Sequence, residues 1–157
     1  MGFRRHAHET DLLMRLLIAE PDGAVRRMIH KACAKSVRVT ECADFQAART
    51  ELAAVRPDAL VTNLRLCDYN GLHLVLLTRS SNRHARCVVH TSRPDPYLIR
   101  EAQSIGAFYE RTERLPLAIA GYLLADLPER DRRDPERVDR RHAFRGGRRA
   151  IDQPVHV

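Results

Sequence analysis

The chain has 157 residues, a formal net charge of +7 and a sequence pI of about 9.8. With 44% hydrophobic and 30% charged residues, it has the composition of a soluble globular protein, long enough for one domain and a tail. The apolar run over residues 12–19 is too short to span a membrane and contains Arg15, so no membrane association is expected. Four cysteines without CxxC spacing favour free thiols in a reducing cytoplasm.

The hydrophobic pattern alternates between strands and helices five times. In chain order, the predicted elements are a strand at 12–19, a helix to about 35, a strand at 37–41, a helix at about 45–55, a strand at 59–63, a helix at about 72–79, a strand at 87–90, a helix at about 96–105, a strand at 107–110 and a helix at 115–127. Strands joined in this way by helices predict a parallel sheet covered on both faces.

Several boundaries carry recognisable local signals. Asp22 and Asp44 are plausible N-caps for the first two helices. The 37–41 strand alternates between apolar and polar residues, which is typical of a half-exposed strand at a sheet edge. Residues 1–11 have no periodicity and are expected to form a flexible arm before a domain at 12–127.

The third predicted strand ends abruptly at a polar residue, Asn63. A polar loop follows and closes on Asn70 and Gly71, a strong turn signal. Open α/β sheets place their functional sites at the carboxyl ends of such strands. Asn63 is therefore the first candidate site residue.

From residue 128 on, the composition changes. The segment 128–157 is dense in arginine and acidic residues, has a Gly146-Gly147 pair and offers few core-forming residues, so it is expected to be largely disordered. Its arginines outnumber its acids, which makes a nucleic-acid partner the alternative function. The interspersed acids weaken that field, and a solvated tail is the favoured interpretation.

Several short stretches occur in a familiar order and spacing. They are 17–22 at the end of the first strand, 56–61 leading into the third, Asn63 eight residues before Gly71, 89–92 at the end of the fourth strand and 106–109 entering the last. Together they resemble the receiver domain of bacterial response regulators over about 12–127. The resemblance implies a flavodoxin-like sheet with strand order 2-1-3-4-5, two helices on one face and three on the other.

The resemblance also implies a phosphorylation site. In that family an aspartate is phosphorylated, a pair of acids holds Mg²⁺ and a lysine pairs with the phosphoryl group. By position, Asn63 stands at the phosphoacceptor, and Glu20 and Pro21 stand at the acidic pair with Asp22 one residue beyond. A neutral amide is a poor nucleophile and a weak Mg²⁺ ligand, and only one carboxylate remains at the pair itself.

The lysine is missing as well. Its position falls near Thr112 or Glu113, while the only lysines, Lys31 and Lys35, lie at the first predicted helix. Arg111 and Arg114 are nearby but do not match in position and reach. The sequence therefore predicts a receiver that is degenerate in its phosphorylation site.

Two residues keep the family's switch positions, Thr91 and Tyr109. In the family, such residues report the state of the site to the face formed by the last two helices and the last strand. The surface around Thr91, Tyr109, Leu115 and Tyr122 is accordingly the candidate contact surface.

Each feature also has a structural interpretation. Asn63 either caps its loop or contributes to a ligand site, and Glu20 is either solvated or hydrogen-bonded or a weak remnant Mg²⁺ ligand. Asp68 is interpreted as a loop residue. His84, Cys87 and His90 have a metal-like HxxCxxH spacing, but Cys87 and His90 should diverge because they are three apart in a strand.

The predicted function is a stand-alone, non-enzymatic signalling module of the two-component or phosphorelay class, acting by protein–protein contact without phosphorylation. A histidine kinase, a phosphotransfer protein or another regulator is the expected partner, a homodimer is left open, and no cofactor is expected beyond weak Mg²⁺ at Glu20. A small enzyme or nucleotide binder is disfavoured because the sequence contains no GxGxxG, P-loop or nucleophile elbow.

Overall fold

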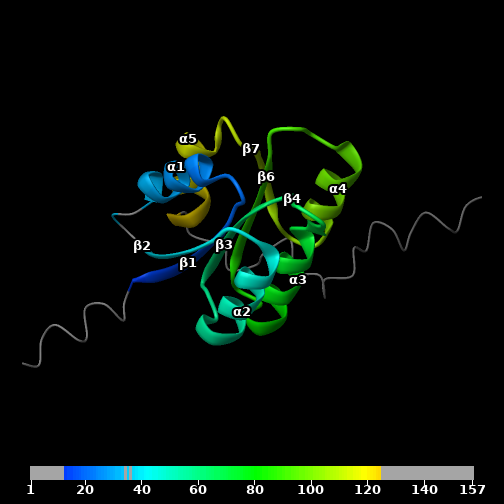
Figure 1. Cartoon of the computed structure of the whole chain (residues 1–157). Helices are drawn as coiled ribbons and strands as arrows, with labels where there is room; N and C mark the ends of the chain where they lie inside the picture. The colour runs from blue at the N-terminus through cyan, green and yellow to red at the C-terminus, as the bar shows by residue number, and fades with distance from the viewer. Residues whose placement is uncertain (1–12, 34, 36, 125–157) are drawn as a thin grey trace, which may run out of the picture.

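The computed structural model describes residues 13–33, 35 and 37–124. Its centre is a five-stranded parallel sheet (Figure 1). The strands are β1 (Met14–Ala19), β2 (Val37–Cys42), β3 (Ala59–Asn63), β6 (Arg86–Thr91) and β7 (Phe108–Arg111). Their order is β2-β1-β3-β6-β7, which is the predicted 2-1-3-4-5 order, and β2 lies at an edge as its alternation predicted.

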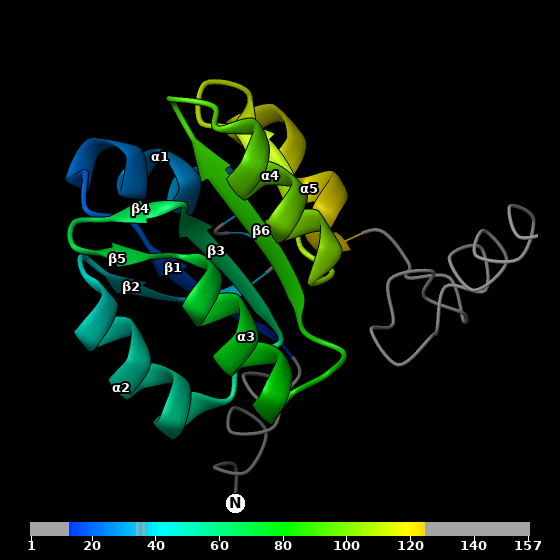
Figure 2. The ribbon, with the colours of Figure 1, turned by 90° about the vertical axis from the view of Figure 1, so that its right-hand side faces the viewer.

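Five helices cover the sheet. They are α1 (Gly23–Cys33), α2 (Phe45–Val55), α3 (Leu72–Ser81), α4 (Pro96–Ser104) and α5 (Leu115–Leu124). Helices α1 and α5 pack on one face, and α2, α3 and α4 on the other (Figure 2). Side chains alternate along each strand, so Leu16 and Ile18 join the core under α1 and α5, whereas Leu17 and Ala19 join the core under the other three helices.

The predicted caps are present. The Asp22 carboxylate accepts hydrogen bonds from Ala24 N at 2.8 Å and Val25 N at 3.2 Å, and the Asp44 carboxylate accepts one from Ala47 N at 2.8 Å. These bonds satisfy backbone donors that the first turn of a helix leaves without intrahelical partners. The helix that begins after Asp22 ends at Cys33 rather than Lys35.

The loop after β3 contains a small hairpin that the sequence pattern did not predict. Strand β4 (Arg65–Leu66) pairs antiparallel with β5 (Tyr69–Asn70). The turn between them is made by Cys67, in a left-handed conformation with φ 55°, and Asp68, which is exposed. Two-residue hairpin turns favour such positive φ values because they match the twist of the strands.

The expected arm at 1–11 and tail at 128–157, and the predicted last turn of the final helix at 125–127, lie outside the described residues. No helix in the described part of the chain has both the length and the apolar character needed to cross a membrane.

Candidate functional site

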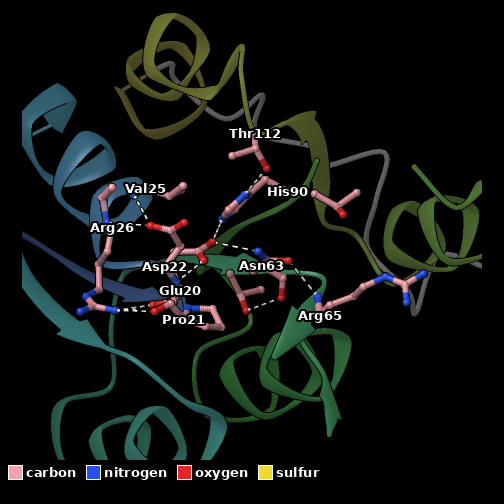
Figure 3. A network of polar contacts seen from close by, with 12 residues as sticks. Glu20, Pro21, Asp22, Val25, Arg26, Asn63, Arg65, His90 and Thr112 are labelled. Atoms are coloured by element: carbon pink, nitrogen blue, oxygen red, sulfur yellow. Dashed lines mark hydrogen bonds and ion pairs between the residues drawn. The ribbon is translucent and has the colours of Figure 1, made fainter. Parts of the chain in front are cut away.

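Three polar side chains meet at the carboxyl ends of adjacent strands: Glu20 just after β1, Asn63 at the end of β3 and His90 in β6 (Figure 3). All three point toward the α1 and α5 face. This follows from strand alternation, since each stands two positions after a residue of the core under those helices. Those core residues are Ile18, Val61 and Val88.

Glu20 is the centre of this cluster. Its side chain is only 2% exposed, and both carboxylate oxygens are engaged. Oε1 accepts a hydrogen bond from Asp22 N at 2.8 Å, and Oε2 accepts one from Asn63 Nδ2 at 2.9 Å. His90 Nε2 lies 3.2 Å from Oε2. Burial raises the pKa of the Glu20 carboxyl above its ordinary value, against the lowering effect of these hydrogen bonds.

Asn63 is held at both ends of its amide. Its nitrogen donates to Glu20, and its Oδ1 accepts a hydrogen bond from Arg65 N at 2.9 Å. The chain also passes close behind it, since a Cβ added at Gly71 would lie 2.1 Å from Asn63 O. The amide therefore closes the loop onto Glu20 and leaves no free group in the phosphoacceptor position.

His90 is completely buried, and its Nδ1 lies 3.0 Å from Thr112 Oγ1. Burial lowers the pKa of His90 to about 4, so the imidazole is neutral at neutral pH. Its contact with Glu20 is therefore not a pair of opposite full charges, and the 3.2 Å separation does not have the angle of a hydrogen bond.

Thr112 is one of the two positions, with Glu113, near which the resemblance puts the lysine. It directly follows β7, and its backbone nitrogen donates to Thr91 O at 3.2 Å, which extends the pairing of β6 with β7. Its neighbours Arg111 and Glu113 point outward and pair with each other at 3.5 Å, and each side chain is more than half exposed. At Thr112 a hydroxyl therefore stands beside a neutral imidazole, and at Glu113 an exposed carboxylate pairs with Arg111.

The remaining acidic-pair residues do not complete a metal site. The Asp22 carboxylate is exposed and caps α1, and Pro21 offers no side-chain ligand. Mg²⁺ usually keeps several of its waters and binds one or two carboxylates. The Glu20 carboxylate is instead buried and already engaged by protein donors. These residues do not fit a Mg²⁺ ion in this arrangement. Of the two structural interpretations of Glu20, the hydrogen-bonded one agrees with the structure, and the solvated one does not.

Arg26 is the cation nearest to this cluster. Its Nη1 donates to Glu20 O at 2.5 Å, and its Nε lies 3.2 Å from Glu41 Oε2. His30 also contacts Glu41, and the pKa of that carboxyl is held below its ordinary value chiefly by His30. Arg26 thus ties α1 to the end of β1 through the backbone oxygen of Glu20 and to β2 through the carboxylate of Glu41, and it does not contact the Glu20 carboxylate.

The switch-equivalent residues are separate from the buried network. Thr91 follows the alternation of Val89 toward the α2, α3 and α4 face, is 2% exposed, and its hydroxyl both donates to Arg93 O and accepts from Arg93 N at 3.2 Å. Tyr109 is half-buried, and its buried hydroxyl has no hydrogen-bond partner among the described residues.

The expected contact surface needs correction. Leu115 is fully buried and Thr91 nearly so, so neither side chain is available to a partner. Tyr122 is half-buried on Phe108, and its hydroxyl donates to Glu110 Oε2 at 3.1 Å. Of the four residues expected there, only the two tyrosines reach the surface in part.

The HxxCxxH spacing brings no ligand set together. Cys87 packs in the core under α2, α3 and α4, whereas His90 points to the opposite side toward Glu20. Asp68 lies exposed at the tip of the β4–β5 hairpin.

No family model matches the sequence, and no curated protein is similar to it at a significant level. Solved structures do match its fold. The chemotaxis protein CheY4 of Vibrio cholerae aligns with a TM-score of 0.60 and 18% identity over 71% of this chain and 99% of that one. The signal receiver domain of the putative response regulator NarL from Mycobacterium tuberculosis aligns with a TM-score of 0.63 and 20% identity over 71% and 94% of the two chains.

A response regulator from Burkholderia pseudomallei, solved with a phosphorylated aspartic acid, a calcium ion and citrate, gives a TM-score of 0.64 and 17% identity over 70% of this chain and 66% of that one. At these identities the likeness concerns the fold. The chain has the fold of response-regulator receiver domains, as the sequence resemblance predicted.

Sequence reasoning did not assign His90 and Thr112 to the site together. The signal for His90 was present, because it is the one polar residue in the apolar run 87–90 and stands near the carboxyl end of the strand. Thr112 was marked only as the place of a missing lysine. Its contact with His90 depends on the register of β6 against β7.

Proposed function

We propose that this chain is a receiver-type module of a two-component or phosphorelay pathway that works without phosphorylation. It is not an enzyme, and it acts in the cytoplasm by contact with a protein partner, such as a histidine kinase, a phosphotransfer protein or another regulator. The receiver fold supports the class of pathway. The composition of the site supports independence from phosphate.

The observation that carries this proposal is the hydrogen bond from Asn63 Nδ2 to Glu20 Oε2 at 2.9 Å. It joins the phosphoacceptor position to the remaining acid, so that the two groups satisfy each other. Phosphoryl transfer needs a nucleophile, a metal and a cation that stabilise the charge developing on phosphorus. Here the nucleophile position is an amide, and the acid is buried behind it.

The test is incubation of the full chain with acetyl phosphate and Mg²⁺, followed by intact mass measurement. A receiver with a complete site serves as the positive control in the same reaction. We expect no phosphoryl adduct on this chain. A stoichiometric adduct would contradict phosphate independence.

The matched variant is Asn63→Asp, which restores a carboxylate at the phosphoacceptor position. We expect it to stay poorly reactive, because Pro21 still replaces an acid and Thr112 with neutral His90 still stands in place of the lysine. Rapid labelling of Asn63→Asp would show that other groups supply the missing charges.

The alternative function, binding of nucleic acid, depends on residues 128–157, which lie outside the described residues. It stays a prediction from charge alone.

A further inference from the structure

Helix α5 is apolar on every side. Its sequence, Leu115–Leu124, contains no charged residue. One side is buried in the core, yet on the opposite side Leu117 is 92% exposed and Leu124 is 52% exposed. A helix that is apolar all round is normally covered on all sides. Within the described residues, nothing covers this outer side.

The outer side has the pattern of a helix-packing surface. Leu117, Ala120, Gly121 and Leu124 are all exposed and follow the spacing of a single helical stripe. A Cβ added at Gly121 would meet no atom within 4 Å, so the middle of the stripe is open. Two leucines with small residues between them form a notch that accepts the side-chain ridge of another helix. We call these four residues the α5 stripe.

A groove of about 380 Å³ continues from the stripe toward α1. Six apolar residues and two lysines line it: Ala32, Cys33, Val37, Ala120, Leu123, Leu124, Lys31 and Lys35. The groove lies where α1 ends and β2 begins, at the amino ends of the parallel strands. Glu20 and Asn63 lie at the opposite, carboxyl ends. This surface is therefore separate from the candidate functional site, and the inference does not rest on the proposed function.

The other side of the groove is basic. Lys31 and Lys35 line it, and Arg27 stands four residues before Lys31 on α1. All three are exposed, and α1 contains no acidic residue. Among the described residues, these three take part in no ion pair, in contrast to Arg26 and His30, which contact Glu41 on the other side of α1. A row of unpaired cations thus runs beside an uncharged apolar stripe.

We propose that the α5 stripe and this basic row bind an amphipathic helix of a different protein. The apolar face of that helix packs on the stripe and into the groove, and carboxylates along its flank pair with Lys31 and Lys35. Charge argues against a second copy of this chain as the partner. In a two-fold dimer through this surface, α5 of one copy would face the lysines of the other copy. Because α5 contains no carboxylate, it could not pair with those lysines.

The test is a selection of displayed helical peptides on the full chain. The peptides have about 18 residues, roughly five turns, with leucines fixed along one stripe and flanking positions drawn from Glu, Gln and Lys. We expect enrichment of Glu at the flanks. The affinity of selected peptides should fall about tenfold or more in Lys31→Glu and be lost in Leu117→Glu.

The matched control is Leu76→Glu, which places the same charge on α3 at another exposed leucine, 51% exposed. It should leave peptide binding unchanged, and circular dichroism verifies that all variants are folded. Selected peptides that show no preference for Glu at the flanks, or that bind Leu117→Glu as tightly as the unchanged chain, would overturn the proposal.

Two further results would assign the surface to another occupant and so overturn it as well. The first is a dimer in sedimentation velocity that Leu117→Glu dissociates, which means a second copy. The second is binding to phosphatidylglycerol vesicles that Leu117→Glu abolishes, without any peptide binding, which means a lipid surface.

Discussion

The protonation state of His90 is determined by its burial in the folded chain. Its imidazole is fully buried between Glu20 and Thr112, and burial lowers its pKa to about 4. Burial also raises the pKa of Glu20. In both groups burial thus disfavours the charged form.

This arrangement predicts a dependence of stability on pH that is specific to His90. The folded-state pKa of about 4 lies below the ordinary value of 6.5, so between these pH values the unfolded chain binds more protons. His90 therefore lowers the free energy of unfolding as pH falls through that window, by at most roughly 3 kcal/mol. The raised pKa of Glu20 acts in the opposite direction above pH 4.5, because there the folded chain binds more protons.

The variant His90→Gln isolates the effect, because an amide keeps hydrogen-bonding capacity but does not titrate. Urea unfolding of both proteins between pH 7 and 4 should show a stability difference that shifts in favour of the variant as pH falls. Parallel curves over the whole range would contradict a buried neutral histidine.

At the scale of elements, the connection between β3 and α3 depends on one close approach. Gly71 N donates to Leu64 O at 3.0 Å, and the glycine stands against the backbone of Asn63. A side chain at this position would collide with backbone, which cannot move aside as a flexible side chain does. This contact places the end of the β4–β5 hairpin next to the end of β3.

Alanine substitutions at Gly71 and Gly121 compare a glycine in a crowded position with one in an open position. Gly71→Ala should destabilise the protein by roughly 2 kcal/mol or more, because its Cβ would meet Asn63 O at 2.1 Å and Thr62 Oγ1 at 2.8 Å. Gly121→Ala, in α5 and with nothing nearby, should stabilise it by about 0.5–1 kcal/mol through helix propensity. Thermal and urea unfolding measure both, and similar effects from the two variants would exclude the proposed contact.

At the scale of the whole molecule, the described members of the two cores under the opposite helix layers run from Met14 to Leu123. A chain that ends at Leu127 should therefore unfold cooperatively, with a midpoint close to that of the full chain. The same pair of proteins tests the nucleic-acid alternative. If the full chain binds DNA with steep salt dependence and the shortened chain does not, the arginine-rich segment is the cause. A shortened chain that fails to fold would show that residues beyond 127 belong to the domain.

The sequence by itself determined the sheet and its order. Apolar runs of strand length with helices between them predicted a parallel sheet covered on both faces, and the resemblance to receiver domains implied its strand order, which is the observed β2-β1-β3-β6-β7. The two caps at Asp22 and Asp44 were also visible, because capping is a local interaction within a few residues.

Local pattern did not predict the β4–β5 hairpin. Its strands have two residues each, which is too short for an alternating pattern to be recognised in the sequence. The candidate site was also only partly visible in the sequence. Asn63 and Glu20 stood out at strand ends, but their direct hydrogen bond joins residues 43 apart in the chain.

Only the tertiary structure decided what the polar groups do. Strand register brought His90 next to Glu20 and set Thr112 beside it, and burial then determined that the imidazole is neutral. Packing likewise decided which side of α5 faces the core, since a helix apolar on all sides carries no such information in its sequence. Sequence pattern fixes which segments form strands and helices because those preferences are local, whereas contacts, burial and protonation arise between distant segments and appear only when the chain is folded.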